Sequence, residues 1–353
     1  MTICTAVTKS HLARARTLAL SIRQVNPDAR VYVLLCDEVD KYFDPASEPF
    51  QLVHLRELRS QSVIREMSFY YTPFEFSCGV RPFLHDYLWN ETDAPEWIFL
   101  DGDTYVLSNL RDIFERLRSG SVLLNPHNTA PAQREFFGYT EYPQLMGGVF
   151  NAGFLGVRRC ATARRFIDWF TRRVRRFGFD GYGMYVDQLW LNHVPQFFPD
   201  VVVYSHPGAN LAFWNLYQRT LEKDPQGRWQ ADGLPLMFIH FSGWEFERPT
   251  EVSKHMPLYQ TAKIPQLEAW KELGLRYRDT LLETGHEQCS SWPYAFAAFD
   301  NGTPITLQMR RHFYRQLRKG QVPVSAASPF DRPADFERLP DASNLTFENP
   351  LLG

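Results

Sequence analysis

The sequence predicts an α/β protein with a mixed, mostly parallel sheet flanked by helices. Two observations indicate this fold class: the chain opens with a strand, a helix and a second strand, and a later apolar run of strand length ends in two carboxylates. With 353 residues the chain can form one large domain or one domain with an appendage. We expect a main domain over residues 1–260 and a helical extension with a partly irregular tail over residues 261–353.

The opening unit comprises two strands, over residues 2–7 and 31–36, joined by a helix. Apolar residues recur at helical spacing after Ser10, the expected N-cap, until Asn26-Pro27 ends the helix. In such a unit, a nucleotide base and ribose commonly bind at the end of the first strand and near Asp37, which follows the second. Asp37 could equally be a cap, so both interpretations stay open.

The next predicted elements are a strand over residues 50–55 and a helix over residues 81–90. Arg81 stands in the first turn of that helix, where the helix dipole disfavours a cation unless an anion binds it. A diphosphate and a surface salt bridge are equally good candidates for that anion.

The run Glu96–Leu100 leads into Asp101-Gly102-Asp103, the centre of the candidate site. In an open α/β sheet, ligands bind just beyond the carboxyl ends of the strands. In extended chain Asp101 and Asp103 would point the same way, and two close carboxylates repel each other unless a cation lies between them. Gly102 leaves room for that cation and for phosphates. The triplet therefore predicts a divalent-metal site that binds a nucleotide diphosphate, although a solvated loop can carry the same letters by chance.

A short helix over residues 109–118 and a strand over residues 121–124 follow. The polar and aromatic loop 127–144 is long enough to cover the acceptor side, and the glycines of residues 147–157 indicate a close approach to a neighbouring strand or to a ligand. The helix predicted over residues 161–177 combines an aromatic face with six arginines. A solvated basic side is the simpler interpretation, and docking onto anionic lipid or an anionic acceptor is the functional one.

Further along, Asp187-Gln188 stands at a predicted helix start within residues 181–191. Strands are expected over residues 201–204 and 235–239, and the second runs into His240. From residue 251 the sequence becomes more helical, notably over residues 264–282 and 304–318. After Gly320 it is rich in Pro, Ala and Ser and is expected to fray.

Composition excludes some classes of protein. A net charge of −2 argues against nucleic acid as the main partner. The five cysteines are odd in number and lack C-x-x-C spacing, which indicates neither a disulfide framework nor a zinc site and favours a reducing, cytoplasmic setting. We expect no signal peptide, because Lys9, His11 and Arg14 interrupt the first apolar stretch, and no apolar run approaches the roughly 20 residues of a membrane helix. We therefore expect no transmembrane segment, while contact with a membrane surface stays open.

Four motifs follow the opening unit in order: LDGDT at residues 100–104, FNAGFLGV at 150–157, DQLWLN at 187–192 and HFSGW at 240–244. Together, over about residues 1–260, they resemble the retaining nucleotide-sugar glycosyltransferases of the GT-A fold. The nearest resemblance is to glycosyltransferase family 8, which includes glycogenin and the lipopolysaccharide galactosyltransferases. The resemblance implies a Rossmann-like GT-A domain that transfers a hexose from a nucleotide-diphosphate donor, a UDP-sugar, to a glycan, lipid-linked, protein or small-molecule acceptor.

The resemblance also implies roles for single residues. Asp101, Asp103 and His240 would bind Mn²⁺ or Mg²⁺, and oxygen ligands with one imidazole suit Mn²⁺. Asp187 and Gln188 would face the sugar and its anomeric carbon. The expected donor-binding residues are Thr5, Ala6, Val7, Asp37, Arg81, Gly102, Asn151, Ala152, Gly153, Gly243 and Lys254. Taken alone, His240 would more often be an ordinary buried or capping histidine, and Asp187 an N-cap.

Two departures from the family pattern stand out. The family has a third acid after Asp-Gln, where this chain has Leu189, and it has Lys-Pro shortly after the His-Phe-x-Gly element. Here Arg248-Pro249 comes later and is followed by Lys254, so either cation could hold the diphosphate. These differences indicate a divergent, bacterial-type member whose acceptor cannot be inherited from the better-known ones.

Retention of configuration requires same-face attack by the acceptor or a covalent step on a side chain, as in glycoside hydrolysis. Because Gln188 is a poor nucleophile, we favour same-face attack over a covalent step on Asp187. Two other functions remain open at this point. One is a catalytically silent nucleotide-sugar or glycan-binding protein of the same fold. The other is an Asp-dependent phosphatase, since an apolar run before D-x-D is similar to the haloacid-dehalogenase signature.

Overall fold

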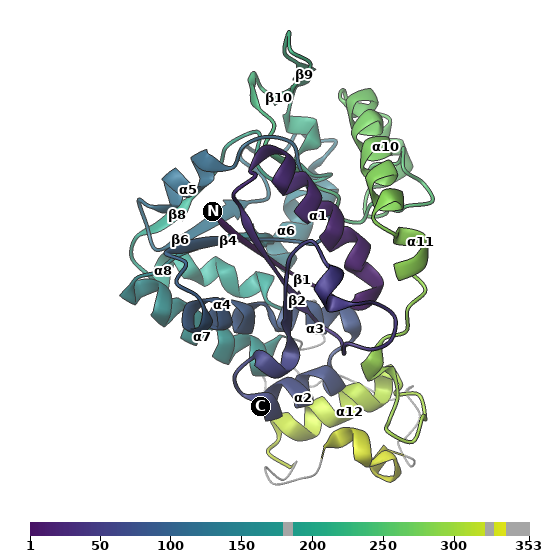
Figure 1. Ribbon diagram of the computed structural model, residues 1–353. Helices are drawn as coiled ribbons and strands as arrows, with labels where there is room; N and C mark the ends of the chain where they lie inside the picture. The colour runs from purple at the N-terminus through teal and green to yellow at the C-terminus, as the bar shows by residue number, and fades with distance from the viewer. Residues whose placement is uncertain (179–185, 322–327, 337–353) are drawn as a thin grey trace.

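The computed structural model describes residues 1–178, 186–321 and 328–336 and has an α/β fold (Figure 1). Its centre is a seven-stranded sheet in the order β3-β2-β1-β4-β7-β6-β8. Among these strands, β7 runs antiparallel to both neighbours and all other pairings are parallel, so the sheet is mixed and mostly parallel, as predicted. The strands are β1 (Thr2–Val7), β2 (Arg30–Leu35), β3 (Gln51–His54), β4 (Glu96–Leu100), β6 (Val122–Pro126), β7 (Phe150–Arg158) and β8 (Val201–Val203).

The central strands are buried on both faces. In β4, Trp97 and Phe99 face one hydrophobic core, whereas Ile98 and Leu100 face the other. Such a strand needs helices on both sides of the sheet. The helices α1 (Leu12–Val25) and α5 (Arg111–Leu117) cover one face, and α4 (Arg81–Glu91) and α7 (Ala161–Phe177) cover the other, as Figure 1 shows for α5 against α4 and α7.

Two smaller sheets, short helices and 3₁₀ turns complete the fold. Two further sheets pair β5 (Thr104–Val106) with β12 (Phe238–His240), and β9 (Leu221–Lys223) with β10 (Trp229–Ala231) and β11 (Leu234–Pro235). The short helices are α2 (Gln61–Tyr70), α3 (Pro73–Gly79), α6 (Glu141–Gly147), α8 (Val194–Phe197), α9 (Leu258–Thr261) and α11 (His286–Cys289). The 3₁₀ turns are η1 (Lys9–His11), η2 (Pro45–Ser47), η3 (Leu55–Glu57), η4 (Phe137–Tyr139), η5 (Gln188–His193), η6 (Leu216–Gln218), η7 (Ala295–Ala297), η8 (Pro329–Asp331) and η9 (Pro333–Phe336).

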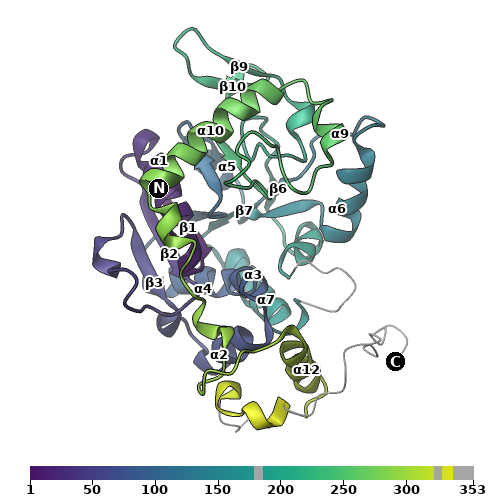
Figure 2. The same cartoon turned by 90° about the vertical axis from the view of Figure 1, so that its right-hand side faces the viewer.

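The predicted helical appendage is present as α10 (Leu267–Glu283) and α12 (Leu307–Arg318). Figure 2 shows α10 lying along the side of the molecule that carries α1, and Trp270 and Tyr277 of α10 belong to the same hydrophobic core as that helix. α12 docks against α2, where the buried Arg310 donates hydrogen bonds to the carbonyls of Ser68, Phe69 and Tyr71. The extension thus completes both cores of the molecule, and its separation as a domain at residue 260 stays a prediction.

Some local predictions need correction. Ser10 is not the N-cap, because η1 precedes α1 and His11 occupies that position without a capping hydrogen bond from its side chain. The loop expected over residues 127–144 contains η4 and the start of α6, and the strand expected over residues 235–239 is divided between β11 and β12. In the tail expected to fray, Phe330 and Phe336 of η8 and η9 are buried. Residues 179–185, 322–327 and 337–353, which include part of the segment before Asp187 and the rest of that tail, lie outside the described residues.

None of the helices in the described part of the chain combines the length and the apolarity that crossing a lipid bilayer requires.

Candidate active site

The three expected metal ligands meet where β4 ends. Asp101 and Asp103 follow β4 directly, and His240 is the last residue of β12, which pairs with β5 so that His240 lies opposite Thr104. The amide of Phe241 donates to the carbonyl of Asp103 at 2.9 Å. The β5–β12 pair therefore fixes a residue from late in the chain beside the acidic turn.

Distances confirm that the three side chains converge. Nε2 of His240 lies 3.1 Å from a carboxylate oxygen of Asp103 and 3.6 Å from one of Asp101. One ligand atom from each residue can be chosen so that all lie within 4.8 Å of one another. Two carboxylates and one imidazole form a donor set that suits Mn²⁺ or Mg²⁺. The cluster is a candidate metal centre, as the sequence predicts.

The space around the cluster depends on Gly153 of β7. The amide of Asp101 donates to the carbonyl of Gly153, so the two residues lie side by side. A Cβ at Gly153 would come within 2.4 Å of Oδ2 of Asp101 and 2.6 Å of Cε1 of His240. The glycine is thus required by the close approach of β7 to the side chains of Asp101 and His240.

The backbone of the acidic triplet differs from the extended chain that we expected. The amide of Thr104 donates to the carbonyl of Asp101 at 3.0 Å, which makes Asp101–Thr104 a turn. The turn leads directly into β5, which pairs antiparallel with β12, and both carboxylates lie close to His240. Gly102 at its apex lies against β1, where a Cβ would come within 2.6 Å of Cγ1 of Val7.

The protonation of the cluster follows from its charges. Burial by itself would raise the pKa of Asp103, but His240 and then Arg14 hold it well below its usual value. Burial likewise lowers the pKa of His240, but the carboxylates of Asp103 and Asp101 outweigh burial and raise it. The ring of His240 and the two carboxylates are therefore electrostatically coupled, and Arg14 and Arg81 add positive charge beside them.

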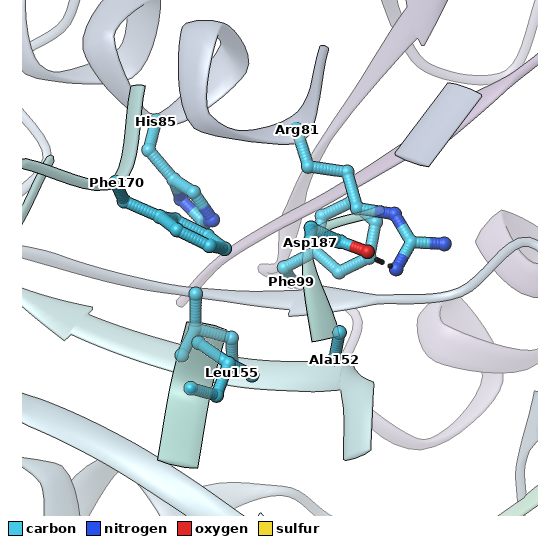
Figure 3. A pocket seen from close by; sticks show the side chains of 8 residues that line it. Arg81, His85, Phe99, Ala152, Leu155, Phe170 and Asp187 are labelled. Atoms are coloured by element: carbon cyan, nitrogen blue, oxygen red, sulfur yellow. Dashed lines mark hydrogen bonds and ion pairs between the residues drawn. The ribbon is translucent and has the colours of Figure 1, made fainter. Parts of the chain in front are cut away.

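Arg81 links the cluster to Asp187. Its guanidinium contacts Oδ1 of Asp101 at 2.5 Å and Oδ2 of Asp187 at 3.2 Å, and it lies over the ring of Phe99. Figure 3 shows the Arg81–Asp187 pair at the edge of a pocket lined mainly by apolar and aromatic side chains. Arg81 is 8% exposed, so it does form salt bridges, but they are buried and not on the surface. The two carboxylates supply the anionic partners that its position in the first turn of α4 requires.

Asp187 stands at the N-cap position of η5 but does not cap it with its side chain. Its carboxylate contacts Arg81 instead, which removes the simplest structural explanation for this residue. Burial raises the pKa of Asp187 to about 6, while the neighbouring charge of Arg81 opposes this rise.

Gln188 is held in a fixed orientation. Its side-chain oxygen accepts hydrogen bonds from the amide of Ala152 at 3.2 Å and from the side chain of Asn151 at 3.4 Å. Its side-chain nitrogen donates to the carbonyl of Gly147 at 2.8 Å. The structure thus brings Asn151, Ala152, Gly153 and Gln188 together on the side of the site formed by β7.

Several residues near Asn151 were not predicted as site residues. The side chain of Asn151 contacts Nε2 of His127 at 3.3 Å and accepts from the side chain of Asn210 at 3.2 Å. Trp214 packs edge-on between His127 and His240. Burial lowers the pKa of His127 to about 4, so its ring is neutral. Residues 206–219 are conspicuously rich in amides and aromatics, but no spacing rule links that segment to β7.

The residues expected to bind the nucleoside, at the end of β1 and after β2, are buried. Ala6 and Val7 point into the two cores, whereas Oγ1 of Thr5 is buried without a partner among the described residues. Oδ1 of Asp37 accepts from the amides of Glu38 and of Ala295, the first residue of η7, and Nζ of the buried Lys9 lies 3.6 Å away. Lys9 ends the loop, residues 5–9, that was expected to lie near the nucleoside, but its ion pair with Asp37 could not be predicted from the sequence.

The two candidate diphosphate cations differ in their surroundings. Arg248 is paired with Glu245 and Glu251 on the surface. Lys254 forms no ion pair with any described residue, and its amide donates to the carbonyl of Gly243 at 2.9 Å. Gly243 has a φ of +67° and lies against the ring of His255, so it anchors this fold-back. The segment with Lys254 therefore returns to the strand end that carries His240.

Arg14 is a further cation at the site. Its guanidinium lies 3.4 Å from Oδ2 of Asp103. In the sequence, Arg14 is one of several polar residues of α1. No neighbouring residue indicates that this part of the helix contacts the acidic turn.

Comparison with known proteins places the fold. No family model matches the sequence. The chain is 26% identical over 267 residues to the uncharacterized protein YfnF of Bacillus subtilis strain 168, covering 71% of this chain and 84% of YfnF. It is 27% identical over 253 residues to YfnD of the same organism, covering 68% and 76%. Among solved structures, the galactosyltransferase LgtC in complex with donor and acceptor sugar analogs is similar with a TM-score of 0.50 at 16% identity, over 78% of this chain and 96% of that one.

The mixed seven-stranded sheet, the helices on both of its faces and the likeness to LgtC together show a GT-A fold. The fold class expected from the sequence is confirmed.

Proposed function

We propose that this protein is a metal-dependent, retaining glycosyltransferase of the hexosyltransferase type, related to family 8, with a UDP-sugar as donor. The observation that supports it most is the convergence of Asp101, Asp103 and His240 at the carboxyl end of the central strand. Arg81 and Asp187 lie directly beside this cluster. A ligand that binds at this edge of an α/β sheet meets all five side chains.

Asp101, Asp103 and His240 would hold Mn²⁺ or Mg²⁺, which supplies Lewis-acid stabilisation of the negative charge on the leaving diphosphate. Around that centre the chain offers two cations of its own. Arg14 lies beside Asp103, and Lys254 is carried by the segment that returns to Gly243. We assign the diphosphate contact to Lys254 in preference to Arg248, because Glu245 and Glu251 already neutralise Arg248.

The donor sugar would lie on the β7 side, against Asn151, Ala152 and Gly153. Buried polar atoms without a protein partner are uncommon and indicate a ligand or water. In the described part of the chain, such atoms near Asn151 include Nδ1 of His127, Oδ1 of Asn210 and Nε1 of Trp214. They match the hydrogen-bonding hydroxyls of a sugar. At the other end, Oγ1 of Thr5 and Oδ2 of Asp37 are equally unpaired and would contact the nucleoside.

We favour same-face attack as the route to retention. The acceptor oxygen forms the new bond to the anomeric carbon as the bond to the phosphate oxygen breaks, and that phosphate oxygen takes the acceptor proton. A covalent intermediate on Asp187 is less favoured because its carboxylate is bound to Arg81. Gln188, held by three hydrogen bonds, would orient the sugar. A product of inverted configuration would contradict this route.

The acceptor side would be formed by an apolar strip that we define as Phe137, Tyr142, Leu145, Met146 and Val149. All five side chains are exposed, and Leu145 is 71% exposed. The strip adjoins the site, because Gln188 bonds to Gly147 and the amide of Val149 donates to Asn192 at 3.0 Å.

The test is a screen of nucleotide sugars with Mn²⁺ for slow donor hydrolysis, repeated with Asp103→Ala. We expect one UDP-sugar to be hydrolysed by the wild type and by the variant at least about 100-fold more slowly, since charge stabilisation of the leaving group is a large part of catalysis. Binding of a nucleotide sugar without turnover would indicate a silent binding protein. Mg²⁺-dependent hydrolysis of a generic phosphate ester would indicate a phosphatase.

A further inference from the structure

The C-terminal ends of α7 and α12 meet at a surface that the site does not use. The guanidinium of Arg318 lies over the ring of Phe177 at 5.3 Å, and the hydroxyl of Tyr314 donates to the carbonyl of Arg176. We call this surface the basic aromatic patch. It consists of Arg172, Arg173, Arg175, Arg176, Phe177, Trp190, Phe197 and Arg318.

Contacts between aromatic side chains make the patch continuous. Trp190 lies 6.4 Å from Phe177, ring centre to ring centre, and its indole nitrogen donates to the carbonyl of Phe177. Arg173 lies over the ring of Trp190 at 5.9 Å. The ring of Trp169 connects Trp190 to Phe197 at 6.2 and 5.8 Å. Phe197 is 54% exposed and Phe177 is 38% exposed, so the patch presents aromatic rings to solvent.

The arginines of the patch form no ion pair with an acidic side chain in the part of the chain that the structure describes. In α7, Arg164 pairs with Asp86 and Asp168, but none of the later arginines forms an ion pair with a described residue. The charges of Arg175 and Arg176 do reach the half-buried Glu66. Even with Glu66 counted against them, the five arginines leave a net positive charge on a chain whose overall charge is −2.

Stabilisation of the helix dipole does not account for this surface. Cations in the last turn favour a helix, and Arg175, Arg176 and Arg318 occupy such positions. That effect fades within one turn and does not explain Arg172 and Arg173 or the exposed rings beside them. Clustered arginines attract anionic lipid head groups, and aromatic rings among them insert at the boundary between head groups and acyl chains.

We propose that the basic aromatic patch docks this protein on the surface of an anionic lipid bilayer. The inference does not rest on the glycosyltransferase activity, because it concerns binding alone. It has a consequence for the site: Gln188 begins η5 and Trp190 of the patch follows two residues later. Docking would hold the site close to the membrane surface, where an acceptor attached to lipid would be presented.

The test is co-sedimentation of the full chain with vesicles of phosphatidylcholine containing 30% phosphatidylglycerol, and with vesicles of phosphatidylcholine alone. We expect binding to the anionic vesicles that 1 M NaCl reverses, because salt screens such attraction. Arg172→Gln, Arg173→Gln and Arg176→Gln combined should weaken partitioning roughly 100-fold, and Phe197→Ser should weaken it further.

The matched control combines Arg23→Gln, Arg56→Gln and Arg111→Gln, which removes the same charge from exposed positions outside the patch. It should bind like the wild type, and thermal melting should show that both triple variants are folded. Equal binding to the two kinds of vesicle, or equal losses in the two triple variants, would overturn the proposal. Binding of a soluble anionic polysaccharide by the patch, without vesicle binding, would overturn it as well.

Discussion

At the scale of single residues, Arg81 connects the candidate metal cluster to Asp187. It is bonded to the metal-ligand candidate Asp101 and to Asp187, and its guanidinium is nearly enclosed. Removing one member of a buried charge group costs more than removing the whole group, because the remaining charges lose their partner. The stability of variants should therefore depend on which charges remain.

We expect Arg81→Gln to lower the free energy of unfolding by about 3 kcal/mol, since it leaves buried carboxylates uncompensated. Adding Asp187→Asn should restore about 1 kcal/mol of that loss by removing one of them. Urea unfolding with a chelator present measures both values. A double variant no more stable than Arg81→Gln would show that Arg81 does not neutralise Asp187.

Gly153 allows a second prediction at this scale. In Gly153→Ala the added methyl group must displace the carboxylate of Asp101 or the ring of His240, so Mn²⁺ affinity should fall at least about tenfold. Gly138→Ala is the control, because a Cβ there meets nothing within 4 Å. Titration followed by water-proton relaxation measures the affinity. An unchanged Mn²⁺ affinity of a folded Gly153→Ala protein would show that metal binding does not depend on this glycine.

At the scale of elements, the pairing of β5 with β12 assembles the site. It is a short, non-local ribbon, and it brings His240 beside Asp103 without a long rigid element. A second contact between elements joins the apolar strip to the site. Helix α6 ends at Gly147, and the carbonyl of Gly147 accepts a hydrogen bond from the side chain of Gln188.

The apolar strip should affect transfer more than donor hydrolysis. Leu145→Gln combined with Met146→Gln changes only exposed side chains, so we expect an intact fold and unchanged hydrolysis of the donor. The KM for the acceptor should rise about tenfold if each side chain contributes about 0.7 kcal/mol of apolar contact. Assays of transfer and hydrolysis on the same preparations check this. An unchanged KM for the acceptor in this variant would show that the strip does not contact the acceptor.

At the scale of the whole molecule, the buried histidines couple stability to pH. Burial, and then the charge of Arg81, lowers the pKa of His85 from 6.5 to about 3. The unfolded chain therefore binds a proton at this residue between pH 6.5 and 3 that the folded protein does not. Because the unfolded state binds more protons there, acidification destabilises the fold by about 1.4 kcal/mol per pH unit from this residue.

His85→Gln should reduce that slope, since the amide oxygen can accept the hydrogen bond from Trp97 without titrating. Between pH 6.5 and 5.0, the wild type should lose about 2 kcal/mol more unfolding free energy than the variant. Urea unfolding at the two pH values gives the difference. Parallel pH profiles would show that His85 does not stay neutral.

The sequence could predict the elements that local periodicity specifies. Residues 161–177 and 81–90 were expected as helices, and the structure has α7 and α4 there. The triad of Asp101, Asp103 and His240 was expected from the resemblance, and the three side chains do converge. Arg14 and His127 could not be found in this way, because their place in the site depends on how distant elements pack. The turn at Asp101 escaped prediction for the same reason, since it leads into β5, whose partner β12 lies far away in the sequence.

The most direct test of the account is pulsed electron paramagnetic resonance of Mn²⁺ added to the protein with UDP. We predict modulation from one directly bound imidazole nitrogen, which disappears in His240→Gln, and coupling to phosphorus that shows the diphosphate on the same ion. Mn²⁺ bound without imidazole coupling, or equally well by the wild type and by Asp103→Asn combined with His240→Gln, would contradict the claim that these side chains hold the metal for the nucleotide.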